Sequence, residues 1–167
     1  GCAVAPPFSI LSIAAPLHKK GVKVKIIDQR IDEKWDMHLR KALREKPVCC
    51  GISTKTGKQI FFGIEAAKVI REETNGDMPI VWGGVHPTLL PEQTLKSPYV
   101  DIVCVGEGDE TFPDLIGALK NHRPLSEVKG IAFLDAGKFV FTGARPFVNV
   151  EELLPTLSPG EKAQILK

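Results

Sequence analysis

Short loops that follow apolar runs of the sequence hold most of the residues suited to contacting a ligand. Glycine lets a ligand approach the backbone closely, and hydroxyl side chains both donate and accept hydrogen bonds. Four of the five loops are rich in such residues, so together they would form a surface suited to binding. The loops are Pro6–Ser9, Asp28–Arg30, Ser53–Gly57, Gly83–Thr88 and Gly106–Thr111.

The apolar runs before these loops predict a parallel β-sheet. Most are rich in Val and Ile and lack strict alternation, which is typical of strands buried on both faces. Ligands bind such sheets beyond the carboxyl ends of the strands, where these loops would lie. The predicted strands are Cys2–Ala5, Val22–Ile27, Val48–Ile52, Ile80–Trp82 and Val100–Val105.

Amphipathic segments between the runs predict helices on both faces of the sheet, and so a three-layer α/β fold. After Asn121, two short strands around Ala136-Gly137 predict a β-hairpin. The predicted helices are Ile10–Lys20, Lys34–Lys46, Gln59–Glu73, Pro91–Lys96 and Asp109–Lys120, and the hairpin strands are Gly130–Leu134 and Lys138–Phe141.

Composition excludes several classes of function. The 167 residues are the size of one domain, and 22 basic against 20 acidic residues give a net charge of only +2. We therefore expect no nucleic-acid partner. No apolar run approaches membrane-spanning length, so we also expect no membrane contact. The four cysteines form no C-x-x-C pair and have no spacing typical of a zinc site, so we expect no metal-ligating residues. We interpret them as buried thiols, which favours a cytoplasmic protein.

Two segments resemble phosphate-binding motifs, but neither matches the required pattern. Between Gly51 and Gly57-Lys58 lie five residues instead of four, and Gln59 stands where a P-loop needs Ser or Thr. Gly106-x-Gly108 begins like a dinucleotide fingerprint, but Thr111 replaces its third glycine, and the motif follows the last predicted parallel strand. Neither motif supports a nucleotide site.

An ordered set of motifs resembles the cobalamin-binding domain of cobalamin-dependent radical SAM enzymes, a family that includes the anaerobic magnesium-protoporphyrin ester cyclase. The resemblance covers nearly the whole chain. Its motifs are Pro6-Pro7 before a helix, Gly21-x-x-Val24-x-x-Ile27-Asp28, Gly51-Ile52-Ser53, Gly83-Gly84-x-His86-Pro87-Thr88, Val100-Asp101-x-Val103, Gly106-Glu107-Gly108-Asp109-Glu110-Thr111, Val128-x-Gly130-Ile131 and Glu151-Glu152-Leu153-x-Pro155.

The resemblance implies a flavodoxin-like, five-stranded parallel sheet that holds cobalamin. It divides the chain into a cobalamin-binding α/β domain (1–126), a β-hairpin packed on it (127–144) and a linker (145–167) towards a radical SAM domain of the same parent protein. That domain would carry the [4Fe-4S] cluster and S-adenosylmethionine. The cofactor-binding residues so implied are Pro7, Phe8, Ser9, Ser53, Thr54, Thr56, Gly83, Gly84, His86, Pro87, Thr88, Gly106, Glu107 and Gly108.

Three departures refine this expectation. Where related cobalamin domains carry D-x-H-x-x-G, this chain has Pro7-Phe8-Ser9-Ile10, so we expect a base-off corrinoid without a histidine ligand. Lys55 replaces the leucine of their S-x-L motif, leaving Ser53 as the partner of the displaced base. The radical SAM motif C-x-x-x-C-x-x-C is missing, so we expect no catalytic residues in this chain and assign any enzyme activity to the parent protein.

Some alternatives stay open. His86 would contact the corrin periphery or the nucleotide tail, or else bond to nearby backbone. Ser53, Thr54 and Thr56 would bond the cofactor, cap the helix that follows, or both. A rival function is a cofactor-free regulatory or interaction module with the same fold, because the Lys55 charge must be explained in a slot for an aromatic base. A flavin site is disfavoured, because Pro6-Pro7-Phe8 offers no cradle of backbone N–H groups.

Overall fold

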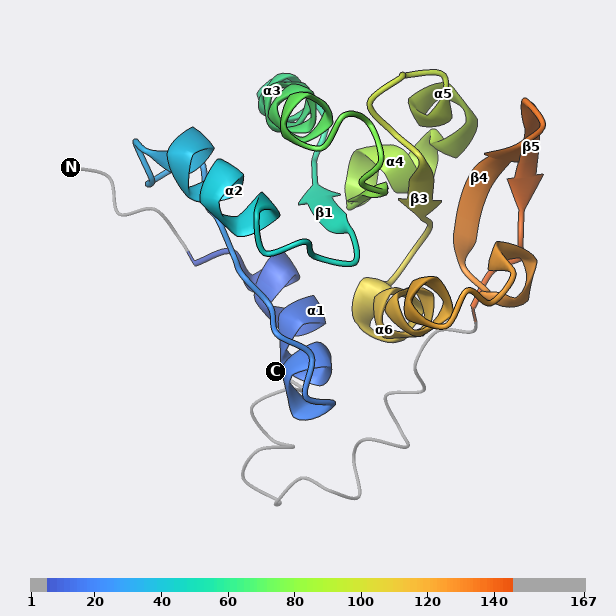
Figure 1. Cartoon of the computed structure of the whole chain (residues 1–167). Helices are drawn as coiled ribbons and strands as arrows, with labels where there is room; N and C mark the ends of the chain where they lie inside the picture. Colours follow the sequence, from blue (N-terminus) through green and yellow to red (C-terminus); the bar gives the residue numbers. More distant parts are fainter. Residues whose placement is uncertain (1–5, 146–167) are drawn as a thin grey trace, which may run out of the picture.

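The computed structural model describes residues 6–145 (Figure 1). The helices are α1 Phe8–Lys19, α2 Trp35–Leu43, α3 Lys58–Glu73, α4 Val85–Leu89, α5 Pro91–Leu95 and α6 Gly108–Lys120, with a 3-10 turn, η1, at Leu125–Glu127. The strands are β1 Cys50–Ser53, β2 Ile80–Gly83, β3 Ile102–Cys104, β4 Ile131–Asp135 and β5 Lys138–Phe141.

The strands form one five-stranded sheet in the order β1-β2-β3-β4-β5. β1 and β2 pair in parallel with Ser53 opposite Gly83, and β3 continues the parallel pairing. β4 then pairs antiparallel with β3, and β5 pairs antiparallel with β4. The predicted hairpin is therefore confirmed, but its strands extend the sheet itself.

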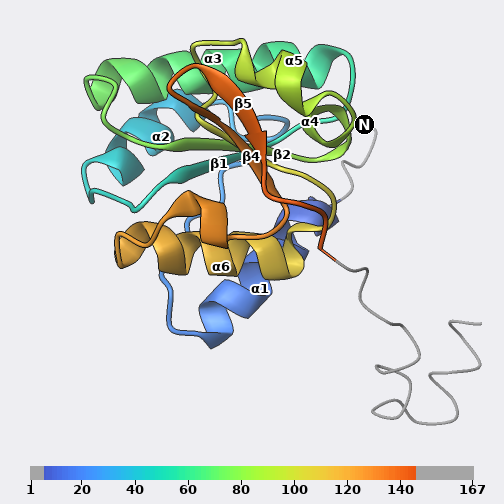
Figure 2. The ribbon, with the colours of Figure 1, turned by 90° about the vertical axis from the view of Figure 1, so that its right-hand side faces the viewer.

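Helices cover both faces of the sheet, which gives the predicted α/β sandwich (Figure 2). In that view α3 and α5 lie above the sheet, while α6 and α1 lie below it. Trp82 belongs to the core between the sheet and the upper layer, and Leu115 to the core below. Both side chains are fully buried, and Trp82 was expected there.

Three of the five predicted parallel strands are confirmed as β1, β2 and β3, and the hairpin strands β4 and β5 make the sheet mixed. No strand forms at Val22–Ile27, where Lys23, Val24 and Lys25 are exposed. In a flavodoxin-like order the second strand pairs only with the first. The predicted first strand, Cys2–Ala5, lies outside the described residues. Of the predicted linker, only Arg145 is described.

Helix α4 was expected to be a loop. Pro87 is its third residue, where the backbone N–H would have no partner within the helix, so proline does not interrupt it. The other helices lie where they were predicted, with ends shifted by at most a few residues. No helix between residues 6 and 145 is both long and apolar enough to cross a membrane.

Candidate cofactor site

The loops after β1, β2 and β3 meet along one edge of the sheet, as expected for the carboxyl ends of parallel strands. The Thr54 N–H donates to the Gly83 carbonyl at 2.9 Å, joining the first two loops. The Gly106 N–H donates to Thr88 Oγ1 at 3.1 Å, joining the second loop to the third. These bonds bring together predicted site residues that lie far apart in the sequence.

Gly84 is the tightest point of this edge. Its φ of +98° and ψ of −170° lie in a region that only glycine adopts readily. A Cβ atom at this position would lie 2.5 Å from the Thr54 carbonyl oxygen. Glycine is therefore required here by the backbone conformation and by the approach of the neighbouring loop.

Small residues occupy one face of β1 and β2. A Cβ on Gly51 would lie 3.1 Å from the Phe112 ring of α6, so Gly51 faces the α6 layer. Ser53, two residues on, shares that face, because side chains of a strand alternate. A Cβ on Gly83 would lie 3.7 Å from the Cβ of Cys104, an ordinary contact. We call Gly51, Ser53 and Gly83 the small face.

The hydroxyl residues of the first loop lie in different environments. Ser53 is half-buried on the small face and Thr56 is exposed. Thr54 is 1% exposed, and its Oγ1 has no hydrogen-bond partner among the described residues. None of the three caps α3, which has no side-chain cap; instead, the Gln59 side chain accepts a bond from the Lys55 N–H at 2.9 Å. The Lys55 side chain itself is exposed.

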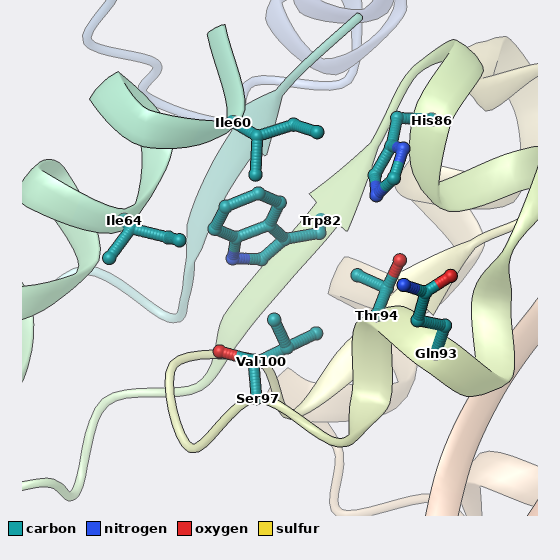
Figure 3. Close-up of a pocket in the computed structure, with 8 residues that line it drawn as sticks. All are labelled: Ile60, Ile64, Trp82, His86, Gln93, Thr94, Ser97 and Val100. Carbon is teal, nitrogen blue, oxygen red and sulfur yellow. The ribbon is translucent and has the colours of Figure 1, made fainter. Parts of the chain in front are cut away.

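His86 turns towards the opposite face of the sheet. It lines a cavity of about 140 Å³ together with Trp82 of β2 and residues of α3 and α5 (Figure 3). Pro87 is buried in α4, and Thr88 is occupied in its bond to Gly106. No sequence pattern indicated this cavity, because its walls come from separate segments. Its full lining is Ile60, Ile64, Trp82, His86, Gln93, Thr94, Ser97 and Val100.

Pro7, Phe8 and Ser9 lie at the start of α1, on the α6 side of the sheet. Ile13 of α1 packs against the first turn of α6, where its Cδ1 would lie 2.8 Å from a Cβ on Gly108. Phe8 is 69% exposed, so its ring is available to a bound molecule. Glu107, which is also exposed, immediately precedes α6.

The remaining histidines lie away from the small face. His18 is exposed near the end of α1, and His122 is exposed just after α6. His38 lies within α2, and its Nδ1 is 2.7 Å from Oδ2 of Asp32, which precedes that helix. Throughout residues 6–145 no three His, Cys, Asp or Glu side chains gather in a way that would hold a metal ion.

The described cysteines are suited to packing and poorly suited to chemistry. Burial raises the pKa of Cys104 to about 12 and that of Cys50 to about 11. Burial, with smaller effects from Cys50 and Cys104, raises the pKa of Cys49 to about 12. All three thiols therefore stay protonated at neutral pH, which agrees with their interpretation as small apolar side chains.

An ion-pair network fixes the last described residues beside the site. Arg145 donates to Asp114 Oδ2 at 2.7 Å and to the fully buried Thr111 Oγ1 at 3.2 Å. Arg123 also donates to Asp114. Burial raises the pKa of Asp114, but the bonds from the two arginines outweigh it and leave that pKa below its usual value. The network attaches the end of the described chain to α6.

Comparison with known proteins places these features in a family. The profile of the B12 binding domain matches residues 3–116. The chain is 30% identical to an uncharacterised methyltransferase of Pyrococcus horikoshii over 89% of this chain and 32% of that protein. It is also 30% identical to the anaerobic magnesium-protoporphyrin IX monomethyl ester cyclase of Synechocystis over 86% and 29%.

A solved structure agrees in fold and sequence. The cobalamin-dependent S-adenosylmethionine radical enzyme OxsB, with aqua-cobalamin and S-adenosylmethionine bound, superposes with a TM-score of 0.74 at 30% identity. The match covers 88% of this chain and 21% of OxsB. The chain thus spans about a third or less of each of these relatives. Its fold, its loops and the profile match together show that the chain belongs to the B12-binding domain family.

Proposed function

We propose that this chain holds cobalamin at the edge formed by the loops after β1, β2 and β3, with the nucleotide base displaced from cobalt and no histidine of this chain beneath the metal. It would present the other face of the corrin to a radical SAM domain of the same protein. Cobalamin supplies a cobalt centre for methyl or radical transfer, and the chain's residues bind and orient it.

The small face carries this proposal. Gly83 and Ser53 leave room beside α6 at the strand ends, and the half-buried Ser53 hydroxyl can bond a base nitrogen there. Gly84, which has no side chain, exposes its backbone next to Gly83. Lys55, whose charge favoured the rival function, is exposed, so no charge has to be buried in the slot. The residues present therefore fit the displaced tail of the cofactor.

The positions of the histidines support the absence of a protein ligand to cobalt. His86, the only one within the candidate loops, lines the cavity on the α3 side of the sheet, opposite the small face. The others lie in or beside α1, α2 and α6, away from the carboxyl ends of β1 and β2. A lower position without histidine would favour the reduced cobalt states of lower coordination.

A radical SAM domain as partner is proposed from the relatives. They are at least about three times as long as the matched chain, and OxsB is named as a radical enzyme that binds S-adenosylmethionine. The exposed Phe8 and Glu107 lie at the starts of the neighbouring helices α1 and α6 and would face such a domain. The reaction and substrate would then belong to the whole protein.

A visible-absorbance titration with methylcobalamin tests the proposal. We expect saturable binding with a shift of the main band to shorter wavelength, matching a cobinamide standard that lacks the base. Replacing His18, His38, His86 and His122 by alanine in turn should leave the position of that band unchanged. An unshifted band would contradict base displacement, and absence of binding in the whole protein would favour the cofactor-free module.

A further inference from the structure

The cavity on the α3–α5 face reaches the same edge of the sheet as the proposed cofactor site. Ile60 and His86 lie in the first turns of α3 and α4, directly after the loops that follow β1 and β2. Ser97 and Val100 precede β3, so they line the far end of the cavity. The cavity therefore runs inward from the candidate edge, on the face opposite the small face.

Its walls differ in chemistry (Figure 3). Ile60, Ile64 and Trp82 form an apolar wall, and the Trp82 indole N–H is already used by the Tyr99 carbonyl at 3.1 Å. His86 and Gln93 face them with Thr94 from the α4–α5 side. An apolar wall facing a few polar groups is typical of a small-molecule subsite.

The polar wall can both donate and accept hydrogen bonds. Thr94 Oγ1 donates to the Leu90 carbonyl at 2.8 Å and keeps its lone pairs for an incoming donor. Ser97 Oγ accepts from the Tyr99 N–H at 3.3 Å and keeps its proton to donate. The Gln93 amide can do both. A primary carboxamide, with two donor hydrogens and one acceptor oxygen, matches this set.

The volume of the cavity and the charge of its lining further restrict the class of ligand. The volume of about 140 Å³ is close to that of a cavity that takes a single benzene ring, roughly 150 Å³. It is too small for a benzimidazole with its ribose and phosphate. None of the eight lining residues is Lys, Arg, Asp or Glu, so a phosphate or carboxylate in the cavity would have no permanently charged partner.

We propose that this cavity is a subsite for one neutral amide arm of the corrin periphery, bonded by His86 and Gln93 against the Trp82 wall. The inference rests on the proposed function and adds a second anchor to it. The nucleotide tail would lie on the small face, and the arm on the opposite face, so the corrin would be held on both sides of β2 and could not rotate about its tail.

Binding titrations of the 167-residue chain with cobalamin and its separate monocarboxylic acids test the subsite. In each acid one amide arm has become a carboxylate. We expect one regioisomer to bind at least about tenfold more weakly than cobalamin, because its anion would enter a cavity that no Lys or Arg lines. His86→Ala and Gln93→Leu should each weaken cobalamin binding about threefold to tenfold and reduce that discrimination.

The controls separate the two proposals. His122→Ala, on the exposed turn after α6, should bind like the unchanged chain. Ile60→Phe adds bulk from the apolar wall and leaves the polar groups unchanged. It should weaken cobalamin binding about as much as His86→Ala does. Tight cobalamin binding, with equal affinity for every acid and no effect of these variants, would overturn the subsite and leave the proposed function intact. Absence of cobalamin binding by the whole protein would overturn both.

Discussion

At the carboxyl ends of β1 and β2, the two faces of the sheet carry side chains of different size. Towards α3, Ile52, Thr54 and Trp82 pack so closely that a Cβ on Gly63 would meet all three within 3.1 Å. Towards α6, Gly83 has one ordinary contact and space beside it. Because side chains alternate along a strand, neighbouring residues build a packed wall on one face and an open, small-residue surface on the other. We therefore expect stability and cofactor binding to depend on different residues of the same strands.

The largest loss of stability is expected at Gly84, where the loop after β2 packs against the loop after β1. Gly84→Ala should destabilise the fold by about 3 kcal/mol or more, because its backbone conformation suits only glycine and the new Cβ meets the Thr54 carbonyl. Urea unfolding measures the change. Gly117→Ala, in α6 with open space around it, is the matched control and should be neutral or up to about 1 kcal/mol more stable.

A pair of substitutions compares the two faces directly. Gly63→Ala should cost about 1–3 kcal/mol of stability, because its Cβ would lie 2.9 Å from the Trp82 ring in the packed wall. Gly83→Ala should leave the urea midpoint nearly unchanged yet weaken methylcobalamin binding about tenfold, because its methyl group enters the slot. Equal losses of stability in both variants would contradict the difference between the faces.

The smallest loss of stability is expected for the ion pairs of α6, and this loss should depend on pH. Arg145→Gln should cost about 1–2 kcal/mol at pH 7, because Asp114 loses one of its two arginines. The Asp114 pKa is lowered by folding, so its contribution is complete above the usual carboxyl pKa and disappears as the pH falls through the lowered value. The difference between variant and unchanged chain should therefore shrink in acid.

Urea unfolding at several pH values measures this loss. Arg123→Gln removes the other arginine from the same carboxylate and is the matched comparison, since it lies within the domain while Arg145 lies at the end of the described chain. Only Arg145→Gln should also speed amide exchange at Thr142, whose N–H bonds the Ile131 carbonyl at 3.0 Å just before Arg145. The same exchange in both variants would contradict an anchoring role for Arg145.

Local patterns predicted much of this fold. The run Ile80–Trp82 became β2, and the spacing of Gln59–Glu73 became α3, because burial and helix periodicity are properties of a few neighbouring residues. Val22–Ile27 forms no strand, because strand formation depends on pairing with distant segments, which a local apolar run does not encode. Val85–Leu89 was missed because a proline near a helix start resembles one in a loop.

Sequence patterns alone predicted which residues would gather at one edge of the sheet, because parallel strands place their following loops together. The sequence also shows the absence of a histidine after the first predicted strand. The direction in which each side chain of these loops faces became clear only from the three-dimensional fold: Ser53 faces α6, and Thr54 and His86 face the α3 layer. This direction depends on strand pairing and helix packing between distant segments, which local residue chemistry does not encode.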